Sequence, residues 1–155
     1  MDDLEGSGLT RNAEITTWVP PSGKTIKINF DGAFDKQRSR AAFGVVARNG
    51  EGRVLIARSK LHENVGSAFA AESLACLCAI QTRIEMEIAA YLRNIQLTAE
   101  HFRWIHFRHI KKEANRLAHT IATESLRREE QEYLNGMVPG FALRQMEEEW
   151  LREPD

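Results

Sequence analysis

Apolar and polar positions alternate along the first part of the chain, and this alternation predicts three strands. The stretch KINFDGAF, residues 27–34, places apolar side chains at alternate positions and Asp31 on the opposite, polar face. Strands are expected at residues 25–31, 41–48 and 53–59. The NGEG stretch between the last two favours a tight hairpin turn, because Asn and Gly tolerate a positive φ. Gly32 is expected to let the chain bend away just after Asp31.

A helical pattern follows the three strands. No Gly or Pro occurs between Gly66 and Gly136, and we expect a helix from about Ala68 to beyond Asn94, continuous through Met86–Glu87. WIHFRHI, residues 104–110, is aromatic and β-branched and predicts a further strand. A second helix is expected at residues 116–134, with Asn115 or a neighbour as its cap. The order β-β-β-α-β-α predicts an α/β fold with a mixed sheet.

Length and composition indicate one domain. The 155 residues carry 43% apolar and 28% charged side chains, which is ordinary for a globular protein. We expect a flexible lead-in at residues 1–23, the domain at 24–135 and an acidic tail at 136–155. The tail sequence QMEEEWLREPD is typical of a short amphipathic helix or a frayed end.

Other sequence features lead us to expect a location inside the cell. The N-terminus has no apolar signal segment, and the longest apolar run, LACLCAI, is too short to span a bilayer. We therefore expect an intracellular protein without a membrane partner, in either the nucleus or the cytoplasm. Cys76 and Cys78 lie two positions apart on a helical run and cannot pair with each other, which favours buried free thiols in a reducing compartment.

The net charge of −1 hides a basic segment. Residues 101–116 carry five Lys or Arg against Glu113, whereas residues 124–155 carry nine acids against four Arg. The basic segment could follow a phosphate backbone with aromatic stacking, or it could be a solvated loop, and both interpretations stay open. The candidate nucleic-acid-binding residues in and beside it are Arg108, Lys111, Lys112, Asn115 and Arg116.

Two acids stand out because of their surroundings. Asp31 ends the expected first strand, where a carboxylate is either a strand cap or a metal ligand. Glu72 lies within FAAESLA on the first helix, and an acid on an apolar stretch is costly to bury without a cation. It could equally be a boundary residue of the amphipathic face. Local sequence leaves both questions open.

Four stretches in order, INFDGAF, AAFGVVARNGEGRVL, SAFAAESLACLCAI and KKEANRLAHTIA, resemble the ribonuclease H family. The resemblance covers roughly residues 18–133 and is to the reverse-transcriptase-like domains of plant genomes and retroelements. That family hydrolyses the RNA strand of RNA–DNA hybrids with two divalent ions, usually Mg²⁺, held by four carboxylates. The resemblance implies that Asp31 and Glu72 are catalytic metal ligands, close enough to share an ion.

The chain also departs from the family pattern. The family's third acid, on its fourth strand, has no counterpart, because AIQTRIEM runs directly into EIAAYLRNIQL. The fourth acid is replaced by His119, which the resemblance implies to be an assisting catalytic residue. The expected fold is thus a ribonuclease H-like sheet truncated by loss of the fourth strand. Mg²⁺ binding should be weakened, with Mn²⁺ as an alternative, and hydrolysis impaired.

These departures leave two classes of function open. One is a hybrid-specific endonuclease of reduced activity. The other is a non-catalytic module, derived from a retroelement ribonuclease H domain, that binds an RNA–DNA hybrid or RNA, or a protein partner. The oligomeric state is left open by the sequence.

Overall fold

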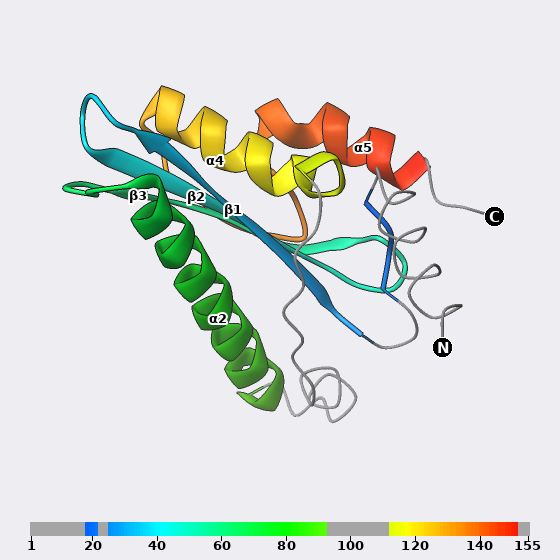
Figure 1. Cartoon of the computed structure of the whole chain (residues 1–155). Helices are drawn as coiled ribbons and strands as arrows, with labels where there is room; N and C mark the ends of the chain where they lie inside the picture. The colour runs from blue at the N-terminus through cyan, green and yellow to red at the C-terminus, as the bar shows by residue number, and fades with distance from the viewer. Residues whose placement is uncertain (1–17, 22–24, 93–111, 152–155) are drawn as a thin grey trace, which may run out of the picture.

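The computed structural model describes residues 18–21, 25–92 and 112–151. One sheet has α2 on one side and α4 with α5 on the other (Figure 1). The elements are β1 (Lys27–Asp35), β2 (Arg40–Arg48), β3 (Val54–His62), α2 (Ala68–Leu92), η1 (Lys112–Asn115), α4 (Arg116–Arg128), β4 (Tyr133–Asn135), η2 (Gly140–Ala142) and α5 (Leu143–Leu151). The predicted α/β fold class, consistent with a ribonuclease H-like domain, is confirmed.

The described strands form a four-stranded sheet in the order β1-β2-β3-β4. Each pair of neighbours is antiparallel, and among these strands β1 pairs with β2 alone. The predicted hairpin turn is confirmed: the Gly52 N–H donates to the Asn49 carbonyl at 3.0 Å, and Gly52 has a φ of 78°. The expected strand at residues 104–110, which would add to this sheet, lies outside the described residues.

β1 is longer than the sequence predicted. It runs through Asp31 and Gly32 to Asp35, and Gly32 pairs with Phe43 of β2. The expected bend after Asp31 is therefore wrong. Gly32 is needed for another reason, because a Cβ there would lie 2.9 Å from the carbonyl oxygen of Ala71. The glycine lets the first turns of α2 approach the strand backbone.

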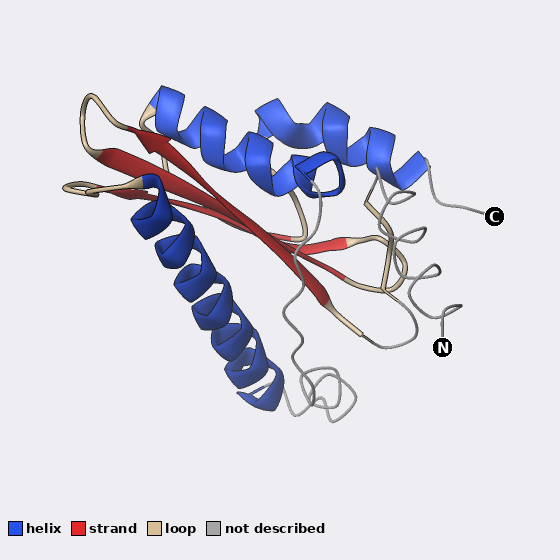
Figure 2. Cartoon of the chain, viewed as in Figure 1, coloured by secondary structure: helices blue, strands red, loops and turns tan. Residues whose placement is uncertain are grey.

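The second predicted helix is shorter than expected. α4 ends at Arg128, and Glu129 adopts a left-handed conformation with φ 56°. Residues 133–135 form β4, which pairs with β3 at the edge of the sheet, instead of continuing the helix to residue 134. Figure 2 shows the helices on the two faces of the sheet. The Gly136 N–H donates to the Leu55 carbonyl at 2.8 Å. Pairing with β3 thus outweighs the helical propensity of the residues after Arg128.

The prediction of an unbroken helix through Met86–Glu87 is confirmed, since both residues lie within α2. Its expected continuation beyond Asn94 lies outside the described residues. Cys76 and Cys78 are free thiols, and Cys78 is buried. Across the described parts of the chain, no helix combines the length and apolarity that crossing a membrane requires.

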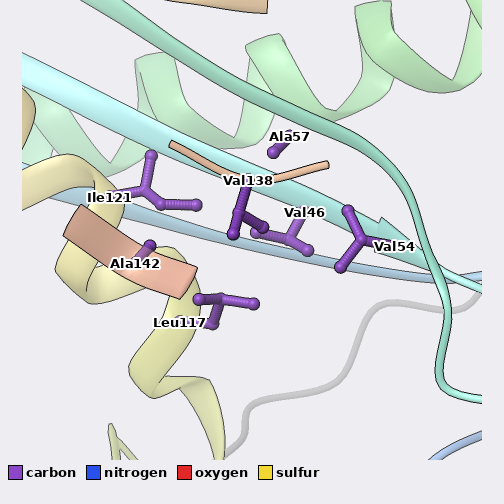
Figure 3. Packing of buried hydrophobic residues seen from close by; sticks show 7 residues of the cluster. All are labelled: Val46, Val54, Ala57, Leu117, Ile121, Val138 and Ala142. Atoms are coloured by element: carbon purple, nitrogen blue, oxygen red, sulfur yellow. The ribbon is translucent and has the colours of Figure 1, made fainter. Parts of the chain in front are cut away.

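A hydrophobic core fills the space between the sheet and α4. Figure 3 shows the cluster: Val46, Val54, Ala57, Leu117, Ile121, Val138 and Ala142. Val138 and Ala142 come from the C-terminal segment, in which the expected short helix is present as α5. A second cluster, on the α2 side, contains Phe43, Val45, Ala75, Cys78 and Ala79. Both faces of the sheet are therefore covered, each by a different helix.

A buried ion pair anchors α5. The Arg48 guanidinium donates to the Glu149 carboxylate, and the two side chains are 2% and 10% exposed. Arg48 also stacks on the Trp18 ring, with 3.8 Å from its central carbon to the ring centroid. Burial lowers the pKa of Arg48, and the Glu149 carboxylate opposes that effect. Since Trp18 precedes β1, the pair connects both ends of the described chain to the sheet.

Candidate metal and nucleic-acid site

Asp31, Glu72 and His119 meet at the outer edge of β1. The Nδ1 atom of His119 lies 2.5 Å from an oxygen of Asp31. The Glu72 carboxyl lies close enough to Asp31 and to the Gly32 backbone N–H for both groups to affect its pKa. The three side chains come from β1, α2 and α4, so residues far apart in sequence approach the same edge of β1.

Close packing of α4 on the sheet positions His119. Asp31 pairs directly with Gly44 of β2, so their Cα substituents face the same side. A Cβ at Gly44 would lie 2.8 Å from the Ala122 backbone nitrogen, which is closer than real Cβ atoms come to a neighbouring atom. The absence of a side chain at Gly44 therefore lets the α4 backbone rest on β2. This contact brings His119 within reach of Asp31.

The two carboxyl groups repel each other. Burial raises the pKa of Glu72, and the neighbouring charge of Asp31 raises it further, against lowering contributions from the Gly32 N–H and His119. A raised carboxyl pKa means that the ionised form is disfavoured. A cation between Asp31 and Glu72 would relieve this repulsion. The electrostatics therefore suit a bound cation.

Asp31 and Glu72 offer oxygen donors to at most one divalent cation. Asp31 shares one oxygen with His119 and keeps the other, and Glu72 contributes oxygen ligands of the kind that Mg²⁺ prefers. Within residues 18–21, 25–92 and 112–151, no group of three His, Cys, Asp or Glu side chains is arranged to hold a metal. One ion that keeps several waters suits two carboxylates. A two-ion site does not fit the residues described.

Asn115 lies beside this site but does not act as the expected side-chain cap. It occupies the N-cap position of α4, yet its side chain makes no capping hydrogen bond among the described residues. Its Nδ2 instead donates to the Phe30 carbonyl at 2.8 Å. No feature of the local sequence predicted this contact, because it links positions 85 residues apart.

The other candidate nucleic-acid-binding residues are only partly described. Arg116 is exposed at the start of α4, and Lys112 begins η1. Arg108 and Lys111 lie outside the described residues, as do the aromatic residues of the basic segment. Lys112 and Arg116 thus lie within one helical turn of Asn115, near the start of α4.

Comparison with known proteins supports a family relationship. A family model described as reverse transcriptase-like matches residues 29–88 and 81–125. The two matches together cover more than half of the chain and include Asp31, Glu72 and His119. Residues 81–88 belong to both matches. No curated protein and no solved structure was found to match the chain.

Proposed function

Because the chain belongs to the reverse transcriptase-like family of ribonuclease H-like domains, we propose that it binds RNA–DNA hybrids in the presence of Mg²⁺. The observation that carries this proposal is the convergence of Asp31, Glu72 and His119 at the β1 edge. The proposal places the protein inside the cell. The free thiols of Cys76 and Cys78 are consistent with a reducing compartment.

Each of the three site residues has a distinct role in the proposal. Asp31 and Glu72 hold the cation, which neutralises phosphate charge and polarises a water molecule when it is bound. His119 is held by Asp31 through Nδ1, while its other ring nitrogen lies 3.5 Å from the Thr123 hydroxyl. The imidazole is about one-third exposed, so it can exchange a proton near the departing product.

Hydrolysis should be slow in this chain. Residues 81–88 fit both parts of the family model, and this overlap supports a direct junction of two helices where the family has an intervening acid-bearing strand. With two carboxylates in place of four, a second ion would lack ligands. We expect hydrolysis in Mg²⁺ at or near background, and a trace in Mn²⁺, which accepts nitrogen ligands more readily.

The test is a labelled-hybrid assay of the purified chain beside Asp31→Asn, in Mg²⁺ and in Mn²⁺. The proposal expects hybrid binding by the wild type and at most a trace of cleavage, which Asp31→Asn removes. Robust turnover by the wild type that Asp31→Asn abolishes would show that the expectation of impaired hydrolysis is wrong. No binding to the hybrid in either metal would overturn the proposal as a whole.

A non-catalytic nucleic-acid-binding module is the second candidate function. The observation that favours it is the engagement of Asp31 by His119, which leaves fewer oxygen atoms for metal ions. Such binding would rest on a few phosphate contacts and would weaken steeply with salt. Neutralising Lys111 and Lys112 together should flatten the salt dependence, whereas unchanged binding would place the surface elsewhere. Cleavage above the Asp31→Asn background would exclude this candidate.

A further inference from the structure

Asn115 occupies the N-cap position of α4, but its side chain does not make the usual capping hydrogen bond with any residue that the structure describes. Asn is among the preferred N-cap residues because its side-chain oxygen accepts a hydrogen bond from the first helical turn. The Asn115 side chain instead turns toward β1 and donates to the Phe30 carbonyl.

The orientation of the Asn115 amide is fixed by this contact. Its Oδ1 is buried and has no hydrogen-bond partner in the described part of the chain. Exchanging the amide nitrogen and oxygen would set two oxygen atoms against each other at Phe30, so the donor must face the strand. The contact with Phe30 is therefore the interaction that determines where the Asn115 side chain lies.

This contact lies next to the catalytic candidates on both elements. Phe30 immediately precedes Asp31, and His119 follows Asn115 by four residues, which places both side chains on one face of the helix. Asn115 to Phe30 and His119 to Asp31 thus form two successive links between α4 and β1. Two links one helical turn apart fix both the rotation of α4 and its position along the strand.

The same edge is also held from α2. In an antiparallel pair, alternate residues of a strand point their backbone groups away from the partner strand. The Phe30 carbonyl accepts a hydrogen bond from Asn115 of α4, and Glu72 of α2 lies close enough to the Gly32 N–H for that group to lower its pKa. The two side chains thus approach outward backbone groups on either side of Asp31. A shift of α4 would change this arrangement around Asp31.

We propose that Asn115 is a positioning residue that holds His119 against Asp31, and that it does so at the expense of capping α4. The assignment deepens the proposed function and rests on it for its catalytic meaning. The contact between the His119 imidazole and the Asp31 carboxylate can be measured without nucleic acid or metal.

The experiment compares Asn115→Ser, Asn115→Asp and Asn115→Ala with the wild type. Ser and Asp can cap α4 but cannot donate to the Phe30 carbonyl at the reach of the Asn amide, whereas Ala can do neither. The His119 ring ¹⁵N and ¹H resonances report its contact with Asp31. Thermal unfolding reports stability, and Mn²⁺-induced broadening near Asp31 reports the affinity for a cation.

We expect Asn115→Ser to unfold within a few degrees of the wild type, with shifted His119 resonances and about a threefold to tenfold weaker affinity for Mn²⁺. Asn115→Asp should shift the same resonances, and Asn115→Ala should add a loss of stability. Unchanged His119 resonances in Asn115→Ser would overturn the assignment, as would shifts that appear only in the least stable variant. Failure of hybrid binding by the wild type would overturn the proposed function, while the His119 resonances would still decide the role of Asn115.

Discussion

The two faces of the sheet are covered by helices that bury very different shares of their apolar side chains. α4 packs on the sheet beside the C-terminal segment, and its buried residues are Leu117, Ala118, Ile121, Ala122 and Ser125. α2 is almost twice as long and contacts the sheet mainly through small residues. Its outward face exposes Phe69, Leu77, Ile84 and Ile88.

This difference shows that apolar content alone does not tell where stability resides. A helix contributes through the side chains that it removes from water. On α4 these include Leu117 and Ile121, which pack against the sheet and the C-terminal segment, whereas on α2 several large residues face outward. The site lies where both helices reach β1, so one of its walls is firmly packed and the other is less so. Substitutions on the α4 side should therefore have the larger effects.

The largest expected effect is at the buried ion pair on the α4 and α5 side. Glu149→Ala would leave the Arg48 guanidinium buried without its carboxylate, which typically costs about 3–5 kcal/mol. Glu148→Ala is the matched control, because Glu148 pairs with the exposed Arg144 and should change stability by about 1 kcal/mol or less. Urea unfolding of the two variants measures the difference. Equal losses would show that Arg48 and Glu149 are not a buried pair.

A direct comparison of the two helices comes next. Ile121→Ala on α4 removes a fully buried side chain and should destabilise the protein by about 2–4 kcal/mol. Ile84→Ala on α2 makes the same chemical change at a position that is 45% exposed, and the loss should be under about 0.5 kcal/mol. Thermal unfolding of both variants provides the measurement. A loss at Ile84 as large as that at Ile121 would mean that the outward face of α2 is covered in solution.

The contact between Gly44 and α4 should give a somewhat smaller effect. A methyl group at Gly44 meets helix backbone that cannot move aside as a side chain would. Gly44→Ala should cost about 1–3 kcal/mol, as overpacking in a core does. It should also displace His119 from Asp31. Gly66→Ala is the control, since a Cβ at Gly66 has no neighbour within 4 Å. Wild-type stability in Gly44→Ala would contradict the close contact.

Much of the fold could be predicted from the sequence because its signals are local. The alternation in β1–β3, the Asn49 and Gly52 turn and the unbroken helical run each depend on neighbouring residues. The end of α4 could not be predicted in this way. The residues after Arg128 have good helix propensity, and only pairing with β3 turns residues 133–135 into a strand. A tertiary contact of this kind cannot be recognised from the neighbouring residues in the sequence.

The sequence singled out the three candidate residues, whose role stays a prediction, but it did not indicate the contacts that position them. Motif order alone indicated Asp31, Glu72 and His119, and the structure brings these three side chains together. The contacts that position them join elements distant in sequence. Gly44 meets Ala122, and Asn115 meets Phe30. A glycine or an asparagine at such positions looks the same in sequence as one in an ordinary turn.

The smallest expected effect concerns the charge on Glu72, and its sign follows from the raised pKa. A carboxyl group whose pKa is higher in the folded state contributes stability at low pH that is lost as the pH rises from its ordinary value of 4.5 through the raised value. Glu72→Gln removes this titration. The variant should therefore gain stability over the wild type across that window and keep the gain at neutral pH. The gain should be about 0.5 kcal/mol or less, because solvent screens the exposed carboxyl group.

Thermal unfolding of the wild type and Glu72→Gln across this pH range measures the effect, and added Mg²⁺ sharpens it. A cation held by Asp31 and Glu72 stabilises the folded state by mass action. Mg²⁺ should therefore raise the melting temperature of the wild type at neutral pH more than that of Glu72→Gln. Parallel pH curves for the two proteins would show that Asp31 and Glu72 do not repel each other. An equal response to Mg²⁺ would place the cation elsewhere, because a ligand that binds through Glu72 must lose affinity when the carboxylate becomes an amide.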